Sequence, residues 1–436
     1  MKKPVLIAWL SIACLFSACT KKDNAPLAPE KGDTTTHKIP ARFQFLVKSV
    51  ADSSAVQGAS VILYNAINDS AVSRFTTGTD GGCDSALDSG SYYPRITAQG
   101  HKPMPMEFQA PAPFIARAGD TVKKTYYLDT LAAAGPGKIM GVTINAGSAQ
   151  PLSGALVIAE DTLSHARYTA TTGPDGVFTL FNLKAGTYRL TALKGGYRAE
   201  IAQPVNVTTS SAAVDTLRMA VEAGATLSGT LSAPTAAAAR NVEIDLLDTA
   251  TFCRIAGMSA LTNDSGGYLI SGIPPGVYFV WASLNNDNYV LDPGKQKLIS
   301  ILESNPEPTH SPAITSAVTL ISPTNAPDSV FPAAADSARP RFVWHKYPGA
   351  KEYLLEVSDA NRRVIWGGPA GTDTSGRIPV VQDTSARYNF DLTAKSAALV
   401  PGQTYQWKVY ADSDSSAITR FISSSEDRMG YFTVPK

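Results

Sequence analysis

Histidine and cysteine, on which many metal sites and nucleophilic enzymes depend, are scarce in this sequence. The 436 residues include five histidines and four cysteines. The histidines are scattered through the chain, at His37, His101, His165, His310 and His345. No H-E-x-x-H zinc motif, Gly-x-Ser-x-Gly elbow, Walker A loop or Rossmann glycine fingerprint occurs. We therefore expect a protein that is not an enzyme, with no cofactor and no metal site.

Long runs of one charge and long hydrophobic runs are also missing. The 38 basic residues nearly balance the 37 acidic ones, so the chain has no electrostatic footprint for nucleic acid. Its N-terminal apolar run, residues 4–16, is shorter than the roughly 20 residues that cross a bilayer. Lys2 and Lys3 precede this run, which is typical of a secretory signal peptide. No second membrane segment follows.

The end of the apolar run is similar to a bacterial lipoprotein signal. It reads L-F-S-A-C over residues 15–19, and this resemblance implies that Cys19 carries lipid and begins the mature protein. Residues 1–18 would then be the signal peptide, and 19–40 a flexible polar tether. An ordinary cleaved signal peptide with a chance cysteine is the alternative. Thr20 stands where inner-membrane lipoproteins carry aspartate, so the resemblance favours the outer membrane, with the exposed side left open.

Glycine and proline, by contrast, are plentiful. The chain has 33 glycines and 29 prolines between segments rich in Thr, Ser, Val and Tyr, which indicates short strands and many turns. A Gly-x-Tyr sequence begins a strand-like segment three times, at Gly90, Gly186 and Gly276. These glycines lie 96 and 90 residues apart by subtraction, a spacing that suits a complete sandwich domain. Cys83 and Cys253 fall in different predicted domains, so we expect no disulfide framework and two small buried side chains.

The segment after each Gly-x-Tyr glycine alternates with a period of two. In residues 187–192, Tyr188, Leu190 and Ala192 share one face of the predicted strand. A tyrosine directly after a turn glycine is typical of a tyrosine corner, in which the ring packs in the core and the hydroxyl binds the backbone upstream. We therefore expect these tyrosines to stabilise the fold and to have no catalytic role.

The repeated pattern V-x-G-A-x-V, T-x-D-x-G-x-F, L-x-x-G-x-Y-x-L-x-A and G-Y resembles the carboxypeptidase regulatory-like domain. The match is strongest over 137–220, with copies predicted at 41–130, 136–220 and 221–305. Cys83 and His101 replace aromatic residues of the pattern in the first copy. The resemblance implies small β-sandwiches of transthyretin-like or immunoglobulin-like type. The family is a non-catalytic accessory domain, so its name implies no peptidase activity.

From residue 316 the pattern changes. Residues 338–344, 350–357 and 399–411 resemble a fibronectin type III domain, predicted over 316–436. Two alternating sets supply its expected core, namely Tyr353, Leu355 and Val357, and Tyr405, Trp407, Val409 and Ala411. The whole chain is thus predicted to be all-β, with tandem immunoglobulin-like or transthyretin-like β-sandwiches in a row after the signal peptide and tether.

The third copy breaks the repeat on its outward face. Val277, Phe279 and Trp281 occupy positions where the second copy has Thr187, Arg189 and Thr191. Burial of such an apolar stripe contributes several kcal/mol, at about 25 cal/mol per Å², so we expect something to cover it. Three covers are open, namely a neighbouring domain or loop of this chain, a protein partner, or a sugar ring stacked on Trp281.

Three weaker chemical candidates remain in the sequence. Asp245 with Asp248, or Asp412 with Asp414, would supply the carboxylate pair of a glycosidase, although turn and surface acids are commonplace. The Asn-Asn-Asp-Asn segment at 285–288 is rich in oxygen ligands for calcium, but Asn and Asp are equally expected there as turn residues. We interpret all three as structural.

Together these features predict a non-catalytic, lipid-anchored envelope protein. Its sandwiches would form a stalk or scaffold for protein interaction or adhesion. The alternative is a cell-surface lipoprotein that captures glycan through aromatic residues of the third or fourth domain. The expected partners are the membrane, through the lipid on Cys19, and either an envelope protein or a polysaccharide.

Overall fold

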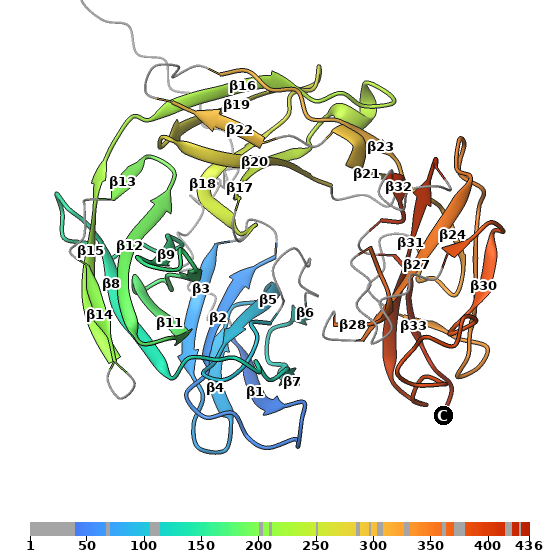
Figure 1. Cartoon of the computed structure of the whole chain (residues 1–436), viewed down its shortest axis with the longest axis horizontal. Coiled ribbons are helices and arrows are strands. Elements are labelled where there is room, and N and C mark those ends of the chain that lie inside the picture. The colour runs from blue at the N-terminus through green and yellow to red at the C-terminus, as the bar shows by residue number, and fades with distance from the viewer. Residues whose placement is uncertain are drawn as a thin grey trace, which may run out of the picture. The chain divides into compact units, whose positions relative to one another are not determined.

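The computed structural model describes most of the chain after residue 39 (Figure 1). The residues described are 40–66, 70–104, 114–199, 204–208, 212–249, 252–284, 288–295, 298–302, 308–326, 332–359, 363–369, 380–414, 421–426 and 429–436. Pro40–Lys436 is one compact unit with its own hydrophobic cores. The predicted signal peptide, Cys19 and the tether lie outside the described residues.

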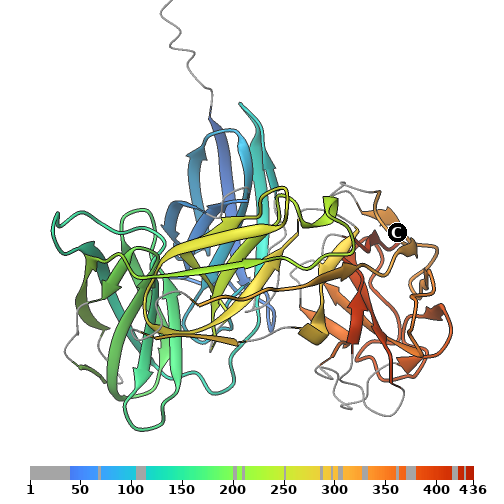
Figure 2. The same ribbon diagram turned by 90° about the horizontal axis from the view of Figure 1, so that it is seen from above.

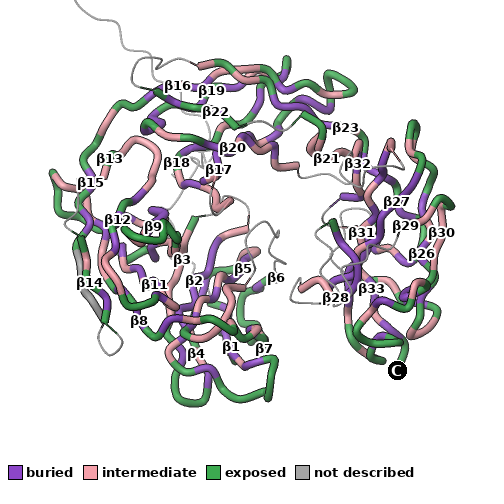
Figure 3. The backbone as a smooth tube through the Cα atoms, viewed as in Figure 1, coloured by how far each residue is buried: buried purple, intermediate pink, exposed green. Residues whose placement is uncertain are grey.

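The described part of the chain is all-β, as the sequence predicts. It contains strands and two single-turn 3₁₀ helices, Ala237–Ala239 and Pro293–Lys295. Arrows dominate both views of the chain (Figure 1, Figure 2). Buried and exposed residues alternate along the strands (Figure 3). These sheets pack as tandem β-sandwich domains, which confirms the predicted fold class.

The first sandwich consists of two sheets, whose strands pair antiparallel except for β1 with β7. Their orders are β4-β1-β7 and β3-β2-β5-β6. Their bounds are β1 (Ala41–Ser49), β2 (Ser60–Asn65), β3 (Ala71–Thr76), β4 (Gly82–Leu87), β5 (Gly90–Thr97), β6 (Phe114–Ala116) and β7 (Thr121–Leu128). Strand β1 pairs in parallel with β7 and buries every second residue, so Phe43, Phe45 and Val47 lie in the core.

The second sandwich repeats this plan, with one sheet path through β10-β9-β12-β13-β15-β8-β11 and β14 paired to β12. Its strands are β8 (Gly137–Asn145), β9 (Leu156–Asp161), β10 (Arg167–Thr171), β11 (Val177–Leu183), β12 (Gly186–Lys194), β13 (Tyr197–Ala199), β14 (Val205–Val207) and β15 (Ala212–Val221). Tyr188, Leu190 and Ala192 are buried in its core, so the predicted alternation along β12 is confirmed.

The third sandwich faces a two-stranded sheet, β16-β19, with a four-stranded sheet, β18-β17-β20-β22. Its strands are β16 (Ala225–Thr230), β17 (Glu243–Asp248), β18 (Arg254–Leu261), β19 (Gly267–Ile273), β20 (Gly276–Ser283) and β22 (Leu298–Ile301). The short pair β21 (Tyr289–Leu291) and β23 (Ile314–Ser316) follows it. Its core is continuous with Leu156 and Ile158 of β9, so the second and third sandwiches share apolar packing.

The three Gly-x-Tyr tyrosines form the predicted tyrosine corner in every copy. The hydroxyls of Tyr92, Tyr188 and Tyr278 each donate to the backbone carbonyl four residues upstream, at 3.0, 2.9 and 2.8 Å. All three rings are buried. Burial raises the pKa of the Tyr188 hydroxyl to about 12, so it stays protonated and keeps donating at neutral pH.

A buried threonine forms a second device that recurs in each copy. Thr77, Thr172 and Thr262 each accept a bond from a backbone N–H and donate to a carbonyl. For Thr172 the partners are Ala155 N at 2.9 Å and Leu152 O at 2.7 Å. Each hydroxyl thereby forms hydrogen bonds with two buried backbone groups just before a core strand begins. Buried backbone groups need such partners because water cannot reach them.

The first and second sandwiches are joined through Asn182. Its side-chain amide donates to Ala98 O at 3.2 Å and to His101 O at 2.9 Å, while its Oδ1 accepts from Gly100 N at 2.6 Å. Asn182 has φ = 65°. Asparagine tolerates this left-handed conformation better than most residues, and it supplies donors and an acceptor together. One side chain thus holds the turn of the preceding sandwich.

The second and third sandwiches meet in a similar way. The turn after β12 donates from Gly195 N to Ala256 O and from Gly196 N to Gly272 O, both at 2.8 Å. Gly272 has φ = 73°. It occupies the position equivalent to Asn182, because Gly272 follows the buried Ile270 by two residues just as Asn182 follows the buried Leu180. The same turn of one sandwich therefore docks on the same strand of the next, twice in succession.

The fourth sandwich consists of the sheets β24-β26-β30 and β25-β33-β31-β27-β28, with β29 and β32 paired to β27 and β31. Its strands are β24 (Leu320–Ser322), β25 (Ala333–Ala334), β26 (Arg341–Trp344), β27 (Glu352–Asp359), β28 (Val364–Gly367), β29 (Val380–Val381), β30 (Ser385–Arg387), β31 (Thr404–Asp412), β32 (Phe421–Ser424) and β33 (Tyr431–Thr433). Both predicted alternating sets on β27 and β31 are buried in its core.

Two acidic residues face each other on the outer side of this sheet. Glu352 of β27 lies directly opposite Asp412 of β31, and both are buried. Asp412 Oδ1 accepts from Asp414 N at 2.9 Å, whereas Oδ2 has no hydrogen-bond partner among the residues that the structure describes. Burial, and then the charges of Asp412 and Asp414, raise the pKa of Glu352. Like charges held this close oppose folding when both are ionised.

Glu352→Gln is therefore expected to raise the free energy of unfolding at pH 7. The folded state holds the Glu352 proton more tightly than the unfolded state, so ionisation of Glu352 costs stability as the pH rises above its ordinary pKa of 4.5. The gain should vanish below that pH. Urea unfolding at pH 7 and pH 4 measures it, with Glu356→Gln on the same strand as control. A Glu352→Gln variant less stable at both pH values would contradict this account.

Candidate interaction surface on the third sandwich

The predicted stripe lies on the outer face of β20. Tyr278, Val280 and Ala282 point into the core and are buried, whereas Val277 is 47% exposed. Phe279 and Trp281 are half-buried on the same side as Val277. The structure thus places all three predicted residues together. Their side chains are partly accessible to solvent, so the stripe is neither fully covered nor fully open.

Neighbouring strands extend this stripe into a broader surface. Leu247 of β17 lies opposite Phe279 on one side, and Leu298 of β22, 56% exposed, lies opposite it on the other. The ring of Phe252 lies 5.3 Å from that of Phe279, and Trp281 follows at 6.3 Å. We call these six residues the third-sandwich outer face: Leu247, Phe252, Val277, Phe279, Trp281 and Leu298.

A polar cluster borders Trp281. Asp245 lies directly opposite Trp281, and its carboxylate accepts from the hydroxyl of Ser283 at 2.6 Å. Arg254 lies 3.3 Å from that carboxylate and also donates to Ser283. The Asp245 side chain is only 5% exposed, and a buried charge needs a charged partner. The Arg254 guanidinium supplies that partner. An aromatic ring beside a fixed ionic pair is an arrangement that can bind a polar, flat-faced ligand.

The weaker candidates from the sequence are not brought together as chemistry would need. Asp245 lies opposite Trp281 on the outer face, whereas Asp248 lies opposite the buried Tyr278. Burial, and then the charge of Asp248, raise the pKa of the Tyr278 hydroxyl. The two acids therefore face opposite sides of β17. Asp414 closes a turn onto Asp412 through its backbone. Residues 285–287 lie outside the described part of the chain.

Two of the four cysteines, Cys83 and Cys253, lie in the described part of the chain, where both are free and half-buried. Burial, followed by the charges of Asp84 and Asp80, raises the pKa of Cys83 to about 11. A thiol with so high a pKa is almost entirely protonated at neutral pH and is a poor nucleophile. Within the described residues, no group of three or more His, Cys, Asp and Glu side chains is placed to hold a metal ion.

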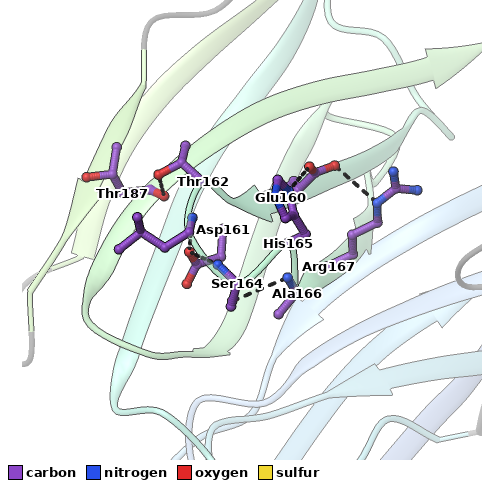
Figure 4. Close-up of polar contacts among 9 residues, drawn as sticks. Glu160, Asp161, Thr162, Ser164, His165, Ala166, Arg167 and Thr187 are labelled. Atoms are coloured by element: carbon purple, nitrogen blue, oxygen red, sulfur yellow. Dashed lines mark hydrogen bonds and ion pairs between the residues drawn. The ribbon is translucent and has the colours of Figure 1, made fainter.

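A polar cluster covers the β9–β10 hairpin of the second sandwich (Figure 4). Glu160 accepts from Arg167 at 3.2 Å and lies 3.0 Å from the ring nitrogen of His165. Asp161 closes the turn by accepting from the backbone N–H groups of Leu163 and Ser164. The Leu163 side chain at the tip is 88% exposed. These contacts satisfy the hairpin itself, so we interpret them as structural.

The first sandwich carries an aromatic pair that sequence reasoning missed. Tyr64 and Tyr93 stack on the outer face of β2 and β5, with ring centroids 5.3 Å apart and planes 11° from parallel. The Arg95 guanidinium lies 5.6 Å from the Tyr64 ring centre and 3.9 Å from the Cys253 sulfur of the third sandwich. The sequence gives no sign of this pair, because Tyr64 and Tyr93 become neighbours only when β2 and β5 pair.

The comparisons with known proteins agree with the architecture of the second sandwich. Residues 138–220 match the model of the carboxypeptidase regulatory-like domain family. That segment coincides with β8–β15, which carries one tyrosine corner and one buried threonine of the repeated set. No curated protein matches the sequence. Among the described residues, no helix is long and apolar enough to cross a membrane.

Several solved structures show a low likeness to the chain. The TIE protein of Bacillus anthracis is 13% identical over 64% of this chain and 51% of its own, with a TM-score of 0.18. This chain therefore spans about half of that protein's length. BcpA, the major pilin subunit of Bacillus cereus, is 12% identical over 64% of this chain and all of its own (TM-score 0.19). GBS52, the minor pilin of Streptococcus agalactiae, is 16% identical over 43% and 98%, respectively (TM-score 0.20). Likenesses this low carry no functional argument.

Proposed function

We propose that this protein is a non-catalytic scaffold of the cell envelope, whose linked β-sandwiches present surfaces for protein interaction or adhesion. The observation that carries the proposal is the repeated junction. The turn after β5 or β12 of one sandwich bonds to the next through Gly100 and Asn182, and again through Gly196 and Gly272. Direct hydrogen bonds of this kind restrain neighbouring domains in a way that a flexible linker does not.

The envelope location is supported by the N-terminal sequence. The lipoprotein-like signal would place lipid on Cys19, and the polar tether that follows would connect it to Pro40. We propose outer-membrane anchoring on the same basis, with either side of that membrane open to the scaffold. The fibronectin type III-like fourth sandwich would supply a further interaction domain.

Deletion of the gene tests the scaffold role in cells. Cells that lack the protein are expected to lose attachment to surfaces or neighbouring cells, or to lose one envelope complex on native gels. The wild-type chain should restore the lost property. A chain whose Cys19 is changed to alanine should not, because it lacks the proposed anchor. Unchanged attachment and unchanged envelope complexes in the deletion strain would overturn the proposal.

Glycan capture is the second candidate function, and the surroundings of Trp281 favour it. The half-buried indole lies beside the Asp245–Arg254–Ser283 cluster, so an apolar platform and fixed hydrogen-bonding groups adjoin. Aromatic rings suit the flat apolar side of a sugar, and the charged groups would bind its hydroxyls. The same surface would equally accept an aromatic or apolar segment of a protein partner.

Trp281→Ala is expected to weaken polysaccharide binding while leaving the fold intact. Loss of one aromatic stacking platform should weaken binding by about 5- to 150-fold, since stacking of a flat ring on an aromatic side chain is worth about 1–3 kcal/mol. Affinity electrophoresis against a polysaccharide panel measures this. Leu269→Ala, at an exposed position of β19 in the same sandwich, is the control. Equal retardation of both variants and wild type would rule out capture at this face.

A further inference from the structure

One end of the fourth sandwich carries a well-fastened loop, residues 388–400, which we call the 388–400 loop. Its ends bond to the segment before β26, through Tyr388 N to Pro340 O at 2.9 Å and Leu399 N to Ala338 O at 2.8 Å. Inside the loop, Asn389 Oδ1 accepts from Ala394 N at 2.9 Å. The loop is therefore held in one conformation by its own contacts and by its neighbour.

Apolar side chains of this fastened loop are exposed to solvent. Leu392 is 80% exposed and Val400 is also exposed, whereas Phe390 is 40% exposed and its ring packs edge-on against Trp366, with ring centroids 5.8 Å apart. Leu392 has φ = 60°, the left-handed conformation that disfavours a branched side chain such as leucine. A leucine at this position stabilises the fold neither by burial of its side chain nor by a favourable backbone conformation. Strain of this kind, where packing does not require it, points to function.

Arginines lie at the base of the 388–400 loop. Arg339 donates to Asn389 O at 3.3 Å, and Arg387 donates to Arg339 O at 3.4 Å. Arg341 lies directly opposite Arg387 on the outer face of β26 and β30. All three are exposed, and among the residues that the structure describes none forms an ion pair with a carboxylate. Lys395 adds a fourth exposed cation within the loop.

The acids nearby leave this end of the sandwich positive. Asp391 is turned inward, where it accepts from the Trp366 indole at 3.1 Å and from the Thr393 hydroxyl at 2.8 Å. Asp336 is exposed and is bonded to the Ser337 hydroxyl. Asp383 precedes the other end of β30, beyond Ser385. Among the described residues, four cations therefore face two acids near the loop, the inward-turned Asp391 and the exposed Asp336.

We propose that the 388–400 loop docks on a lipid bilayer that contains anionic phospholipid. Leu392 and Phe390 would enter the boundary between headgroups and acyl chains, and the arginines would bind the phosphates. Exposed apolar side chains with a cationic border are the combination that favours such an interface. The guanidinium fork suits phosphate oxygens, and three arginines at one end of the domain suit a surface with many phosphates. This contact does not depend on the proposed scaffold role.

Vesicle flotation of the compact unit 40–436 tests the proposal without any contribution from an N-terminal lipid. The protein should float with phosphatidylcholine–phosphatidylglycerol vesicles at a 3:1 ratio, and about tenfold less with phosphatidylcholine alone. Leu392→Asn should reduce flotation with the anionic vesicles by about tenfold without loss of thermal stability, because asparagine tolerates the left-handed backbone. Arg341→Gln with Arg387→Gln should have a similar effect.

Two control variants distinguish binding through the 388–400 loop from non-specific binding of exposed apolar or basic side chains to vesicles. Leu163→Asn removes an equally exposed leucine from the second sandwich, and Arg189→Gln removes an exposed arginine there. Both should float like the wild type. The proposal is overturned if the wild type stays with the soluble fraction, or if Leu392→Asn floats as well as Leu163→Asn. Binding to an anionic polysaccharide without binding to vesicles would likewise overturn it.

Discussion

Gly195→Ala is expected to break the junction between the second and third sandwiches. A Cβ at this position would lie 2.2 Å from the carbonyl oxygen of Gly257, a backbone atom that cannot yield without moving β18. The turn must then lift, and the bonds from Gly195 to Ala256 and from Gly196 to Gly272 would be lost with it. Overpacking of this kind costs about 1–3 kcal/mol. Calorimetry should show a lower melting temperature, and hydrogen exchange should show faster exchange at the amides of residues 195 and 196, which donate these bonds.

Gly147→Ala is the matched control for that experiment. Its Cβ would meet only the side-chain oxygen of Asn145, at 3.4 Å, in an exposed turn of the second sandwich. It should therefore melt like the wild type. If Gly195→Ala and Gly147→Ala were equally harmless, the backbone contacts at the junction would contribute nothing to the stability of the unit.

Thr172→Val is expected to destabilise the second sandwich by about 1–3 kcal/mol. Valine has nearly the shape of threonine, so packing is preserved while the hydroxyl is lost. Ala155 N would lose its hydrogen-bond acceptor in a buried position, whereas Leu152 O would keep the bond that the Thr143 hydroxyl donates to it at 2.8 Å. A buried donor left without a partner costs about 1–3 kcal/mol. Urea unfolding followed by circular dichroism measures the change.

Thr191→Val controls for the loss of a hydroxyl in the same sandwich. Thr191 lies on the exposed side of β12, opposite Ile158 of β9, and its backbone pairing is unaffected by the change. It should alter stability by less than about 0.5 kcal/mol. A Thr172→Val variant as stable as Thr191→Val would show that water or a small shift satisfies Ala155 N. The Thr172 hydroxyl would then contribute nothing to stability.

The sequence was sufficient to predict the cores, because their signals are local. Period-two alternation around Tyr188 and Trp407 identifies a buried face directly, and both residues are buried as expected. The turn glycine before Tyr188 likewise predicts the corner bond, whose two partners are only four residues apart. The stripe of Val277, Phe279 and Trp281 was visible for the same reason, since it interrupts that alternation.

The junctions were not predictable, because their partners are distant in the chain. Asn182 lies 84 residues from Ala98 and 81 from His101, and no pattern near Asn182 distinguishes it from a turn asparagine. Arg254 and Asp245 approach Ser283 only after three strands have taken their register. The left-handed backbone of Leu392 was not predictable either, since leucine is not a residue type that indicates this conformation.

Hydrogen exchange at the amides of Gly100, Gly195 and Gly196 tests the central claim most directly, namely that the sandwiches are joined by hydrogen bonds into one scaffold. All three amides are donors at a junction, in turns that would otherwise face water. The account predicts protection close to that of the core amides of β9 and β12. Exchange at the rate of an open turn, with β9 and β12 still protected, would show independent domains on flexible connections and would contradict the account.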